Sequence, residues 1–539
     1  MRGLSSHQDT FVLDRLPPPG LQPEFVFTLP ELRYPERLNC AALLLDQWVE
    51  KGEGERVAIR TPQDTWSYGQ LWQRANQIAW VLVEEMGLVP GNRVLLRGYN
   101  SPLLVAAWFG VVKAGGVVVA TMPLLRSKEL VEIIQKAQIS HALCDVRLAD
   151  ELQAALPSCP TLRSVLYFGD GSADGLEAQM ARKSDAFPTL QTMATDPVLV
   201  AFTSGTTGKP KGCVHFHRDV LAICDTFSRH ILRPEPSDAF IGSPPLAFTY
   251  GLGGLLAFPF RVGATSILLE RATPDLLLPA IVELGATVCF SSPTAYRAMV
   301  SQVGEGPLGR LRKCVSAGEA LPVPTRRAWR EATGVEIIDG IGSTEMLHIF
   351  ISHREEEAKE GAIGKAVPGY LATVLDEEGS EAPPGQLGYL AVKGPTGCRY
   401  LDDAERQAGY VKGGWNVTGD ACHRDEEGYF VYHGRVDDII VTAGYNVSPL
   451  EVEEVLLQHP AVVECAVVGE PNPERGQIVK AYVVLRAGWQ GSDQLVQELQ
   501  EFVKQRIAPY KYPRAIEFRD ALPRTITGKI QRFRLRQGG

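Results

Sequence analysis

Apolar positions in the first part of the chain alternate between a strand-like and a helical spacing. The run at Arg93–Leu96 has the short, bounded form of a strand, the run beginning at Leu103 has helical spacing, and Val117–Ala120 is again strand-like. A strand, a helix and a strand in this order are typical of parallel pairing, so we expect a layered α/β fold. The alternation continues in helices predicted at Leu130–Ala137 and Ala149–Leu156 and strands predicted at His141–Cys144 and Ser164–Phe168.

Later segments predict a second sheet and a small terminal unit. Short apolar runs at Thr265–Leu269, Thr287–Phe290 and Cys314–Ser316 are further strand candidates. From residue 434 onward, helical and strand-like segments follow one another over roughly a hundred residues, the size of a small α/β domain. We therefore predict a large N-terminal domain at residues 1–433 and a small C-terminal domain at residues 434–539. The small domain has predicted helices at Pro449–Gln458 and Asp493–Ile507 and predicted strands at Ala461–Gly469 and Ile478–Leu485.

Composition indicates an ordinary globular protein rather than a nucleic-acid or membrane protein. The 539 residues are 45% hydrophobic and 22% charged, and the net charge of -9 provides no broad basic field for nucleic acid. The stretch Pro102–Leu125 has the length of a membrane span, but Lys113 and the pair Gly115-Gly116 interrupt it. We therefore expect neither a nucleic acid nor a membrane as a partner.

Cysteine usage and the N-terminal segment indicate the compartment. The ten cysteines occur singly, without the paired spacing of a zinc site, as free thiols do in a reducing environment. Residues 1–19 lack the apolar segment of a secretory signal. These features predict a cytoplasmic protein.

A loop at Thr203–Gly212 is dense in hydroxyls, glycines and lysines, and it directly follows the strand-like run Val198–Phe202. Glycines after a buried strand allow backbone N–H groups to point at an anion, so the loop is interpreted as a phosphate cradle. A solvated surface turn is the alternative, because Gly and Thr also favour turns. A P-loop is disfavoured, because Lys209 is followed by Pro210 where a P-loop has a Ser or Thr for the metal.

Two further segments place carboxylates beside turn-forming glycines. Glu345 ends the segment Asp339–Glu345, and such a carboxylate can bind Mg²⁺ together with substrate phosphates, to which Thr344 can donate. Alternatively, Glu345 caps a helix whose N-terminus is marked by Ser343 and Thr344, a role that is compatible with metal binding. Asp420, in a Thr-Gly-Asp sequence, can accept hydrogen bonds from both hydroxyls of a ribose.

Six short motifs together resemble the adenylate-forming superfamily, which comprises acyl-CoA synthetases, firefly-type luciferases and the adenylation domains of peptide synthetases. The resemblance depends on the order and spacing of the motifs rather than on any single one. They are TSGTTGKPKG at 203–212, GSTE at 342–345, TGD at 418–420, GRVDD at 434–438, AGYNVSPLEVE at 443–453 and TGK at 527–529.

The resemblance implies a two-step reaction between a large N-terminal domain and a mobile C-terminal domain. A carboxylic acid first attacks the α-phosphate of ATP, which releases pyrophosphate and forms an acyl-adenylate. A thiol, most often that of coenzyme A, then attacks the adenylate carbonyl and releases AMP. Between the steps the small domain rotates about a hinge at Asp437.

The resemblance also implies roles for individual residues. Lys529 would bridge the acid carboxylate and the α-phosphate, Thr344 would lie near that phosphate, and Glu345 would hold Mg²⁺. The remaining contacts to the nucleotide or its phosphates are assigned to Thr203, Ser204, Gly205, Thr206, Thr207, Lys211, Asp339, Asp420, Arg435 and Gly444.

The predicted acid pocket is short and aromatic. Ile341 stands where the superfamily usually has a tyrosine, and the segment Asp339–Phe350 resembles the benzoate-CoA ligase branch. The segment His215–Leu232 looks closest to enzymes that act on 2-aminobenzoate, which is therefore the expected acid, with benzoate next. The pocket is assigned to Phe248, Thr249, Tyr250, Gly251, Ile341 and His348.

Several alternatives remain open from the sequence. His348 can equally be a structural histidine with no contact to the acid. The thiol can belong to a carrier protein instead of coenzyme A, the acid can be a medium-chain fatty acid, and the chain can be an inactive nucleotide-binding scaffold. A luciferase-like oxygenase shares the first step. Either a monomer or a homodimer is compatible with the sequence.

Overall fold

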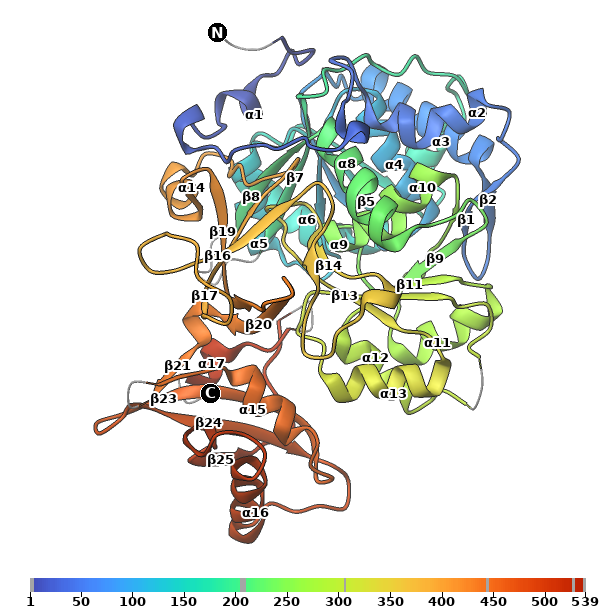
Figure 1. Ribbon diagram of the computed structural model, residues 1–539. Coiled ribbons are helices and arrows are strands. Elements are labelled where there is room, and N and C mark those ends of the chain that lie inside the picture. Colours follow the sequence, from blue (N-terminus) through green and yellow to red (C-terminus); the bar gives the residue numbers. More distant parts are fainter. Residues whose placement is uncertain (1–3, 204–209, 305–306, 443–444, 526–528, 537–539) are drawn as a thin grey trace.

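A computed structural model describes residues 4–203, 210–304, 307–442, 445–525 and 529–536 (Figure 1). The predicted phosphate-loop residues Ser204, Gly205, Thr206 and Thr207 lie outside these ranges, as does Gly444.

The first sheet has the strand–helix alternation predicted for the N-terminal part of the chain. Its order is β6-β5-β3-β4-β7-β8, and all neighbours pair in parallel except the antiparallel pair β7 and β8. The helix α4 (Pro102–Lys113) connects β3 to β4, which places both strands in the same direction. The strands are β3 (Arg93–Arg97), β4 (Val117–Thr121), β5 (His141–Asp145), β6 (Ser164–Phe168), β7 (Pro197–Thr203) and β8 (Lys211–Phe216).

A second sheet of nine strands confirms the further strand candidates. Its order is β15-β14-β13-β12-β11-β9-β10-β1-β2, and its central strands pair in parallel. The strands are β1 (Val57–Arg60), β2 (Thr65–Ser67), β9 (Ala239–Gly242), β10 (Thr265–Ile267), β11 (Val288–Ser291), β12 (Lys313–Ser316), β13 (Ile337–Gly342), β14 (Ile349–Ser352) and β15 (Lys365–Ala366).

A third sheet is antiparallel and leads into the terminal unit. It consists of β16 (Leu371–Leu375), β17 (Gly388–Lys393), β18 (Val411–Lys412), β19 (Trp415–Arg424) and β20 (Phe430–Arg435). After β20, a short 3-10 turn at Val436–Asp438 connects to a separate sheet with its own hydrophobic cluster.

This terminal sheet and its helices, called here the small unit, lie at the lower end of Figure 1 in orange and red. Its strand order is β22-β21-β24-β23, with β25 beside β24. The elements are β21 (Ile440–Thr442), β22 (Tyr445–Val447), α15 (Pro449–Leu456), β23 (Val462–Asn472), β24 (Gly476–Leu485), α16 (Asp493–Lys504), β25 (Ala515–Phe518) and α17 (Arg532–Arg536).

Helices pack on the faces of the sheets of the large part. The helix α3 begins at a capping box in which the Ser67 side chain accepts from the Gln70 N–H, at 3.2 Å, and Gln70 accepts in return from the Ser67 N–H. Besides α4, the α-helices of the large part are α1 (Phe11–Asp14), α2 (Gln47–Glu50), α3 (Tyr68–Trp80), α5 (Ser127–Ala137), α6 (Ala149–Ala155), α7 (Leu176–Met180), α8 (His217–Ile223), α9 (Thr249–Leu252), α10 (Phe258–Val262), α11 (Pro274–Glu283), α12 (Pro293–Val300), α13 (Val323–Thr333) and α14 (Ala404–Tyr410).

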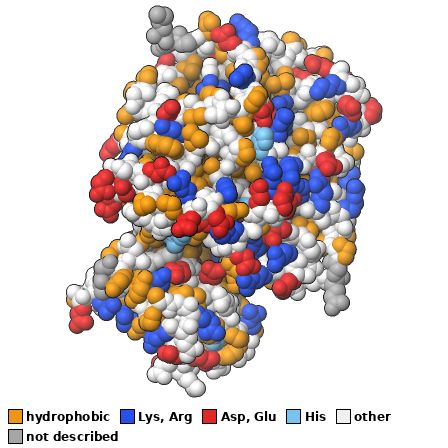
Figure 2. Space-filling view, viewed as in Figure 1, with side chains coloured by type: hydrophobic (Ala, Val, Ile, Leu, Met, Phe, Trp, Pro, Cys, Tyr) orange, Lys and Arg blue, Asp and Glu red, His pale blue; other side chains and the backbone are white. Residues whose placement is uncertain are grey.

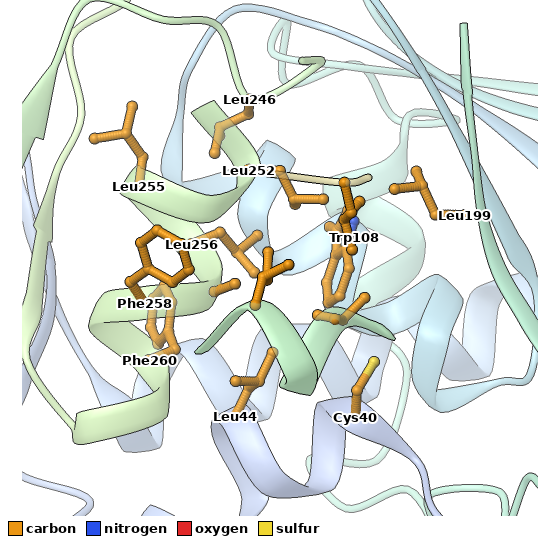
Figure 3. Packing of buried hydrophobic residues seen from close by; sticks show 14 of the residues in the cluster. Cys40, Leu44, Trp108, Leu199, Leu246, Leu252, Leu255, Leu256, Phe258 and Phe260 are labelled. Atoms are coloured by element: carbon orange, nitrogen blue, oxygen red, sulfur yellow. The ribbon is translucent and has the colours of Figure 1, made fainter. Parts of the chain in front are cut away.

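The chain is helical from residue 249 to residue 262, but not uniformly α-helical. A π-helical turn at Gly253–Ala257 separates α9 from α10. Its two glycines let neighbouring side chains approach closely, since a Cβ at Gly254 would lie 2.6 Å from the ring of Phe290. Figure 3 shows apolar side chains from this segment and from Trp108 and Leu44 packing together, and a cavity of about 10 Å³ lies beside Trp108.

All ten cysteines are buried, and none forms a disulfide. Among the helices of the described residues, none has the length and apolar composition needed to cross a membrane.

Candidate active site

The antiparallel hairpin of β7 and β8 places the two described ends of the phosphate loop side by side. Thr203 ends β7 and pairs in register with Lys211, the first residue of β8. The ammonium group of Lys211 lies 6.0 Å from the centre of the Tyr400 ring. The Lys211 end of the loop therefore lies near Tyr400, with the Thr203 end beside it in the hairpin.

Glu345 lies in the turn between β13 and β14, so the alternative that it caps a helix is wrong. The Tyr400 hydroxyl donates to Glu345 Oε1 at 2.6 Å. The neighbouring Thr344 carbonyl accepts from His215 Nε2 at 2.7 Å, which fixes the backbone of the turn to β8. These two bonds hold a half-buried carboxylate beside the phosphate hairpin.

Tyr400 is a site residue that the motifs did not indicate. Burial and the negative charge of Glu345 raise the pKa of its hydroxyl, so the phenol remains a donor at neutral pH. No group of three or more His, Cys, Asp or Glu side chains in the described part of the chain can hold a metal ion. Glu345 would therefore bind Mg²⁺ as a single protein carboxylate, with substrate phosphates and water as the other ligands.

Asp420 and Arg435 are neighbours across β19 and β20. They pair in register, and Arg435 NH1 donates to Asp420 Oδ1 at 2.9 Å and to the Thr418 carbonyl at 2.8 Å. Gly419, which directly precedes Asp420, has a φ of +76°, and a Cβ there would lie 2.6 Å from Arg435 NH2. The glycine of the Thr-Gly-Asp motif thus makes room for the arginine, and two predicted nucleotide residues come together.

Asp339 lies on β13 and is buried in the same sheet that carries Glu345 at its end. Burial raises the pKa of the Asp339 carboxyl to about 7. The positive charge of Arg326 and the side chain of Ser316, which pairs in register with Asp339, lower the pKa and offset part of this effect. The Asp339 backbone N–H donates to His353 Nε2 at 3.1 Å. Ile341, two residues further along β13, is partly buried against the main hydrophobic core.

Lys529 comes from the small unit but lies beside the end of β12 in the large part. A Cβ at Gly318, where φ is +90°, would lie 3.9 Å from Lys529 Cε. The Thr525 N–H donates to the Lys529 carbonyl at 2.7 Å, and the Lys529 N–H donates to Thr525 Oγ1 at 3.0 Å. Thr525 thus holds the exposed Lys529 close to the large part. Figure 2 shows that the surface narrows between the large part and the small unit.

The predicted acid-pocket residues gather around α9. The Tyr250 hydroxyl donates to the carbonyls of Ser291 and Val315, at 3.1 and 3.0 Å, so the ring is fixed between β11 and β12. Gly251 packs closely, because a Cβ there would lie 2.0 Å from the Pro245 carbonyl oxygen. Thr249 is buried and Phe248, at the N-cap of α9, is partly buried.

His348 is buried in an aromatic cage. Its ring centre lies 4.6 to 6.4 Å from the ring centres of Phe227, Tyr250, Phe258 and Phe290. Burial lowers its pKa to about 3, against an opposite effect of the Tyr250 backbone, so the imidazole is neutral. Among the described residues, neither ring nitrogen has a hydrogen-bond partner of ordinary geometry. A buried polar group without a partner is costly, and this makes His348 a candidate to meet a ligand.

The imidazole also depends on a glycine. A Cβ at Gly253 would lie 2.3 Å from His348 Cδ2, so only glycine allows the ring to occupy this place. Asp437, the predicted hinge, is exposed in the 3-10 turn Val436–Asp438 and is not part of the group around Glu345.

Similarity to known proteins extends over nearly the whole chain. The model of the AMP-binding enzyme family matches residues 45–399, and that of the AMP-binding enzyme C-terminal domain matches residues 451–529. The benzoate–CoA ligase of Thauera aromatica is 38% identical over 518 residues, covering 94% of this chain and 98% of the ligase. The mitochondrial acyl-coenzyme A synthetase ACSM3 of Homo sapiens is 32% identical, covering 94% of this chain and 90% of the synthetase.

The fold is also shared with a solved ligase. The crystal structure of the anthranilate CoA ligase AuaEII in complex with anthranoyl-AMP has a TM-score of 0.90 and 33% sequence identity to this chain. The alignment covers 95% of this chain and 99% of that one.

Proposed function

Because the chain belongs to the AMP-binding enzyme family, we propose that it is an ATP-dependent aryl-acid:CoA ligase, with 2-aminobenzoate or benzoate as the acid. The observation that carries the proposal is the aromatic cage around His348, which includes the partly buried Tyr250 of α9. Rings of this kind favour the flat face of an aryl acid. The anthranilate and benzoate ligases among the similar proteins support the same substrate class.

In the proposed first step, the acid carboxylate attacks the α-phosphate of ATP and pyrophosphate leaves. Lys529 would offset the charge as the two anions approach, and Lys211 and Thr203 would hold the outgoing phosphates. Mg²⁺, bound through Glu345 and the phosphates, would supply charge neutralisation there. Asp420 and Arg435 would position the ribose. The loop residues Ser204, Gly205, Thr206 and Thr207, which lie outside the described residues, belong to the same proposal.

In the proposed second step, the thiolate of coenzyme A attacks the acyl carbonyl and AMP leaves. The small domain, taken as residues 434–539, would rotate about Asp437 between the steps and bring Gly444 toward the site. We place the reaction in the cytoplasm, where ATP and coenzyme A are both supplied.

We further propose that His348 contacts the ortho substituent of the acid. The neutral imidazole has one N–H donor and one acceptor nitrogen, and among the described residues neither has a hydrogen-bond partner of ordinary geometry, although the Tyr250 backbone acts on the ring. An ortho amine could donate to the acceptor nitrogen, which benzoate could not do. Thr249, also buried at α9, is the second polar side chain of this wall.

The proposal is tested by AMP formation with coenzyme A across benzoate, 2-aminobenzoate, 2-hydroxybenzoate, phenylacetate and medium-chain fatty acids. We expect the highest kcat/KM with an aryl acid. The variant His348→Phe keeps an aromatic ring but removes both nitrogens, so the preference for 2-aminobenzoate over benzoate should fall about 2- to 10-fold. Best turnover on a fatty acid would refute the aryl pocket.

A medium-chain acyl acid is the second candidate, because the similarity to an acyl-coenzyme A synthetase extends over almost the entire chain. The same acid series separates the two candidates directly. Replacing coenzyme A with a carrier-protein thiol tests the remaining choice of acceptor.

A further inference from the structure

Four charged side chains join the large part to the small unit beside Lys529. Arg297 on α12 and Glu319 after β12 belong to the large part, whereas Glu464 on β23 and Arg524 belong to the small unit. Arg297 NH2 lies 3.8 Å from Glu464 Oε1, and Arg524 NH1 lies 4.0 Å from Glu319 Oε1. Arg524 also forms an ion pair with Glu464. The charges alternate in sign, and two of the three pairs cross between the two bodies.

Two members of this group, Arg524 and Glu319, lie close to Lys529. Arg524 forms a β-bridge with Ile530, so it lies beside the backbone that directly follows Lys529. Glu319 directly follows Gly318, the residue over which Lys529 Cε lies. A shift of the small unit would therefore separate the ion pairs and withdraw Lys529 together.

The large part holds its own members of the group in place. Glu319 Oε2 accepts hydrogen bonds from the Thr294 hydroxyl at 2.7 Å and from the Thr294 N–H at 3.3 Å, at the start of α12. Arg297 is on the same helix, one turn later. The helix α12 thus carries the positive charge of Arg297 and holds the negative charge of Glu319 through Thr294. The large part therefore presents one positive and one negative side chain to the small unit.

Partial burial makes these pairs stronger than ordinary surface pairs. The Glu464 side chain is 14% exposed and the Arg524 side chain is 27% exposed. Charges in such positions are less screened by water and salt than fully exposed ones. The two pairs that cross between the bodies have N–O distances of 3.8 and 4.0 Å, longer than those of a charge-assisted hydrogen bond.

We propose that Arg297, Glu319, Glu464 and Arg524 form an interdomain latch that holds Lys529 over the site for adenylation and opens before thioester formation. These are positioning residues that act through Lys529. The inference rests on the proposed function, because it assumes that the small unit moves between two half-reactions. A latch of this kind favours the arrangement for adenylation over the arrangement for thioester formation. It therefore affects the ratio of the adenylation rate to the thioester-formation rate.

The first test compares the half-reactions separately. Adenylation is measured as acid-dependent ATP–pyrophosphate exchange, and thioester formation is measured from preformed aryl-adenylate and coenzyme A. In Glu464→Gln, the ratio of adenylation rate to thioester-formation rate should fall about 3- to 10-fold. Arg297→Gln should shift the ratio in the same direction, and Arg297→Lys, which keeps the charge, should restore most of it.

A matched control removes an ion pair that lies within the small unit. Lys480 contacts Glu470 at 2.9 Å and Glu517 at 3.4 Å, on strands of one sheet. Lys480→Gln should leave the ratio unchanged. Raising the salt from about 50 mM to about 500 mM should lower the ratio in the wild type but not in Glu464→Gln, since screening weakens the same pairs. Equal loss of both half-reactions in Glu464→Gln would overturn the latch.

The second test needs no substrate and therefore does not depend on the proposed reaction. Hydrogen exchange is measured on the free protein for peptides that contain Thr525 and Lys529. Glu464→Gln should speed exchange there at least about 3-fold, and Lys480→Gln should not. Unchanged exchange would overturn the latch. If the wild type instead shows no pyrophosphate exchange with any acid while the hydrogen-exchange result holds, the proposed function fails and the latch stands as an interdomain contact.

Discussion

Asp339 is expected to make the free energy of unfolding decrease as the pH rises from about 4 to about 7. Burial on β13 raises the pKa of its carboxyl from an ordinary 3.8 to about 7. Below pH 3.8 the carboxyl is protonated in both states, and its burial as a neutral group costs no ionisation energy. Above that pH the unfolded chain loses the proton first, so the stability present in acid is lost as the pH approaches the folded pKa.

The magnitude follows from the two pKa values. The difference between 3.8 and about 7, at about 1.4 kcal/mol per pH unit, corresponds to about 4 kcal/mol once both states are ionised. Between about pH 5 and about pH 8, this carboxyl should account for a loss of about 2 to 3 kcal/mol. Asp339→Asn cannot ionise, so the variant should not show that loss.

The assay is chemical unfolding of the ligand-free wild type and Asp339→Asn at the two pH values. The control is Asp196→Asn, because Asp196 accepts from the hydroxyls of Ser5 and Ser6, each at 2.5 Å, and its pKa is lowered. A lowered pKa has the opposite sign, so Asp196 stabilises the fold above its ordinary pKa and loses this effect as the pH falls. The same pH dependence in Asp339→Asn and the wild type would refute the reasoning.

Three further predictions concern the reaction. Lys529→Ala should slow ATP–pyrophosphate exchange about 10²- to 10³-fold, because a preorganised donor is lost, whereas a solvated lysine would give almost no effect. Asp437→Pro should slow thioester formation more than adenylation, since proline restricts φ at the proposed hinge; equal loss in both half-reactions would contradict the assignment. Tyr400→Phe should slow adenylation about 10-fold and raise the Mg²⁺ concentration needed for half-maximal rate, because Glu345 loses a donor; an unchanged Mg²⁺ dependence would argue against its metal role.

The layered part of the fold was predictable because its signal is local. Each strand and helix between Arg93 and Phe168 is a short apolar run or a helical repeat with a clear end, and the structure has all of them. The π-helical turn at Gly253–Ala257 was not predictable in this way, because its glycines pack against His348 and Phe290, which come from distant segments.

The same limit applies to the candidate site. The apolar run after Glu345 is too short for its period to separate a helix from a strand, and antiparallel pairing of β13 with β14 decides the outcome. Tyr400 is separated from Glu345 by 55 positions and belongs to none of the motifs, so only the folded chain reveals their hydrogen bond. The motifs named Lys529, but its place beside Gly318 depends on how the two bodies meet.

The burial of every cysteine has a consequence for an enzyme that makes thioesters. An acyl-adenylate is an electrophile that any accessible thiolate can attack, and a protein thiolate would trap the acyl group before coenzyme A arrives. Burial raises the pKa of all ten thiols, including Cys213 and Cys398 close to Glu345, so they stay protonated and out of reach. The incoming substrate then carries the sole competent sulfur nucleophile, and the protein is protected from acylating itself.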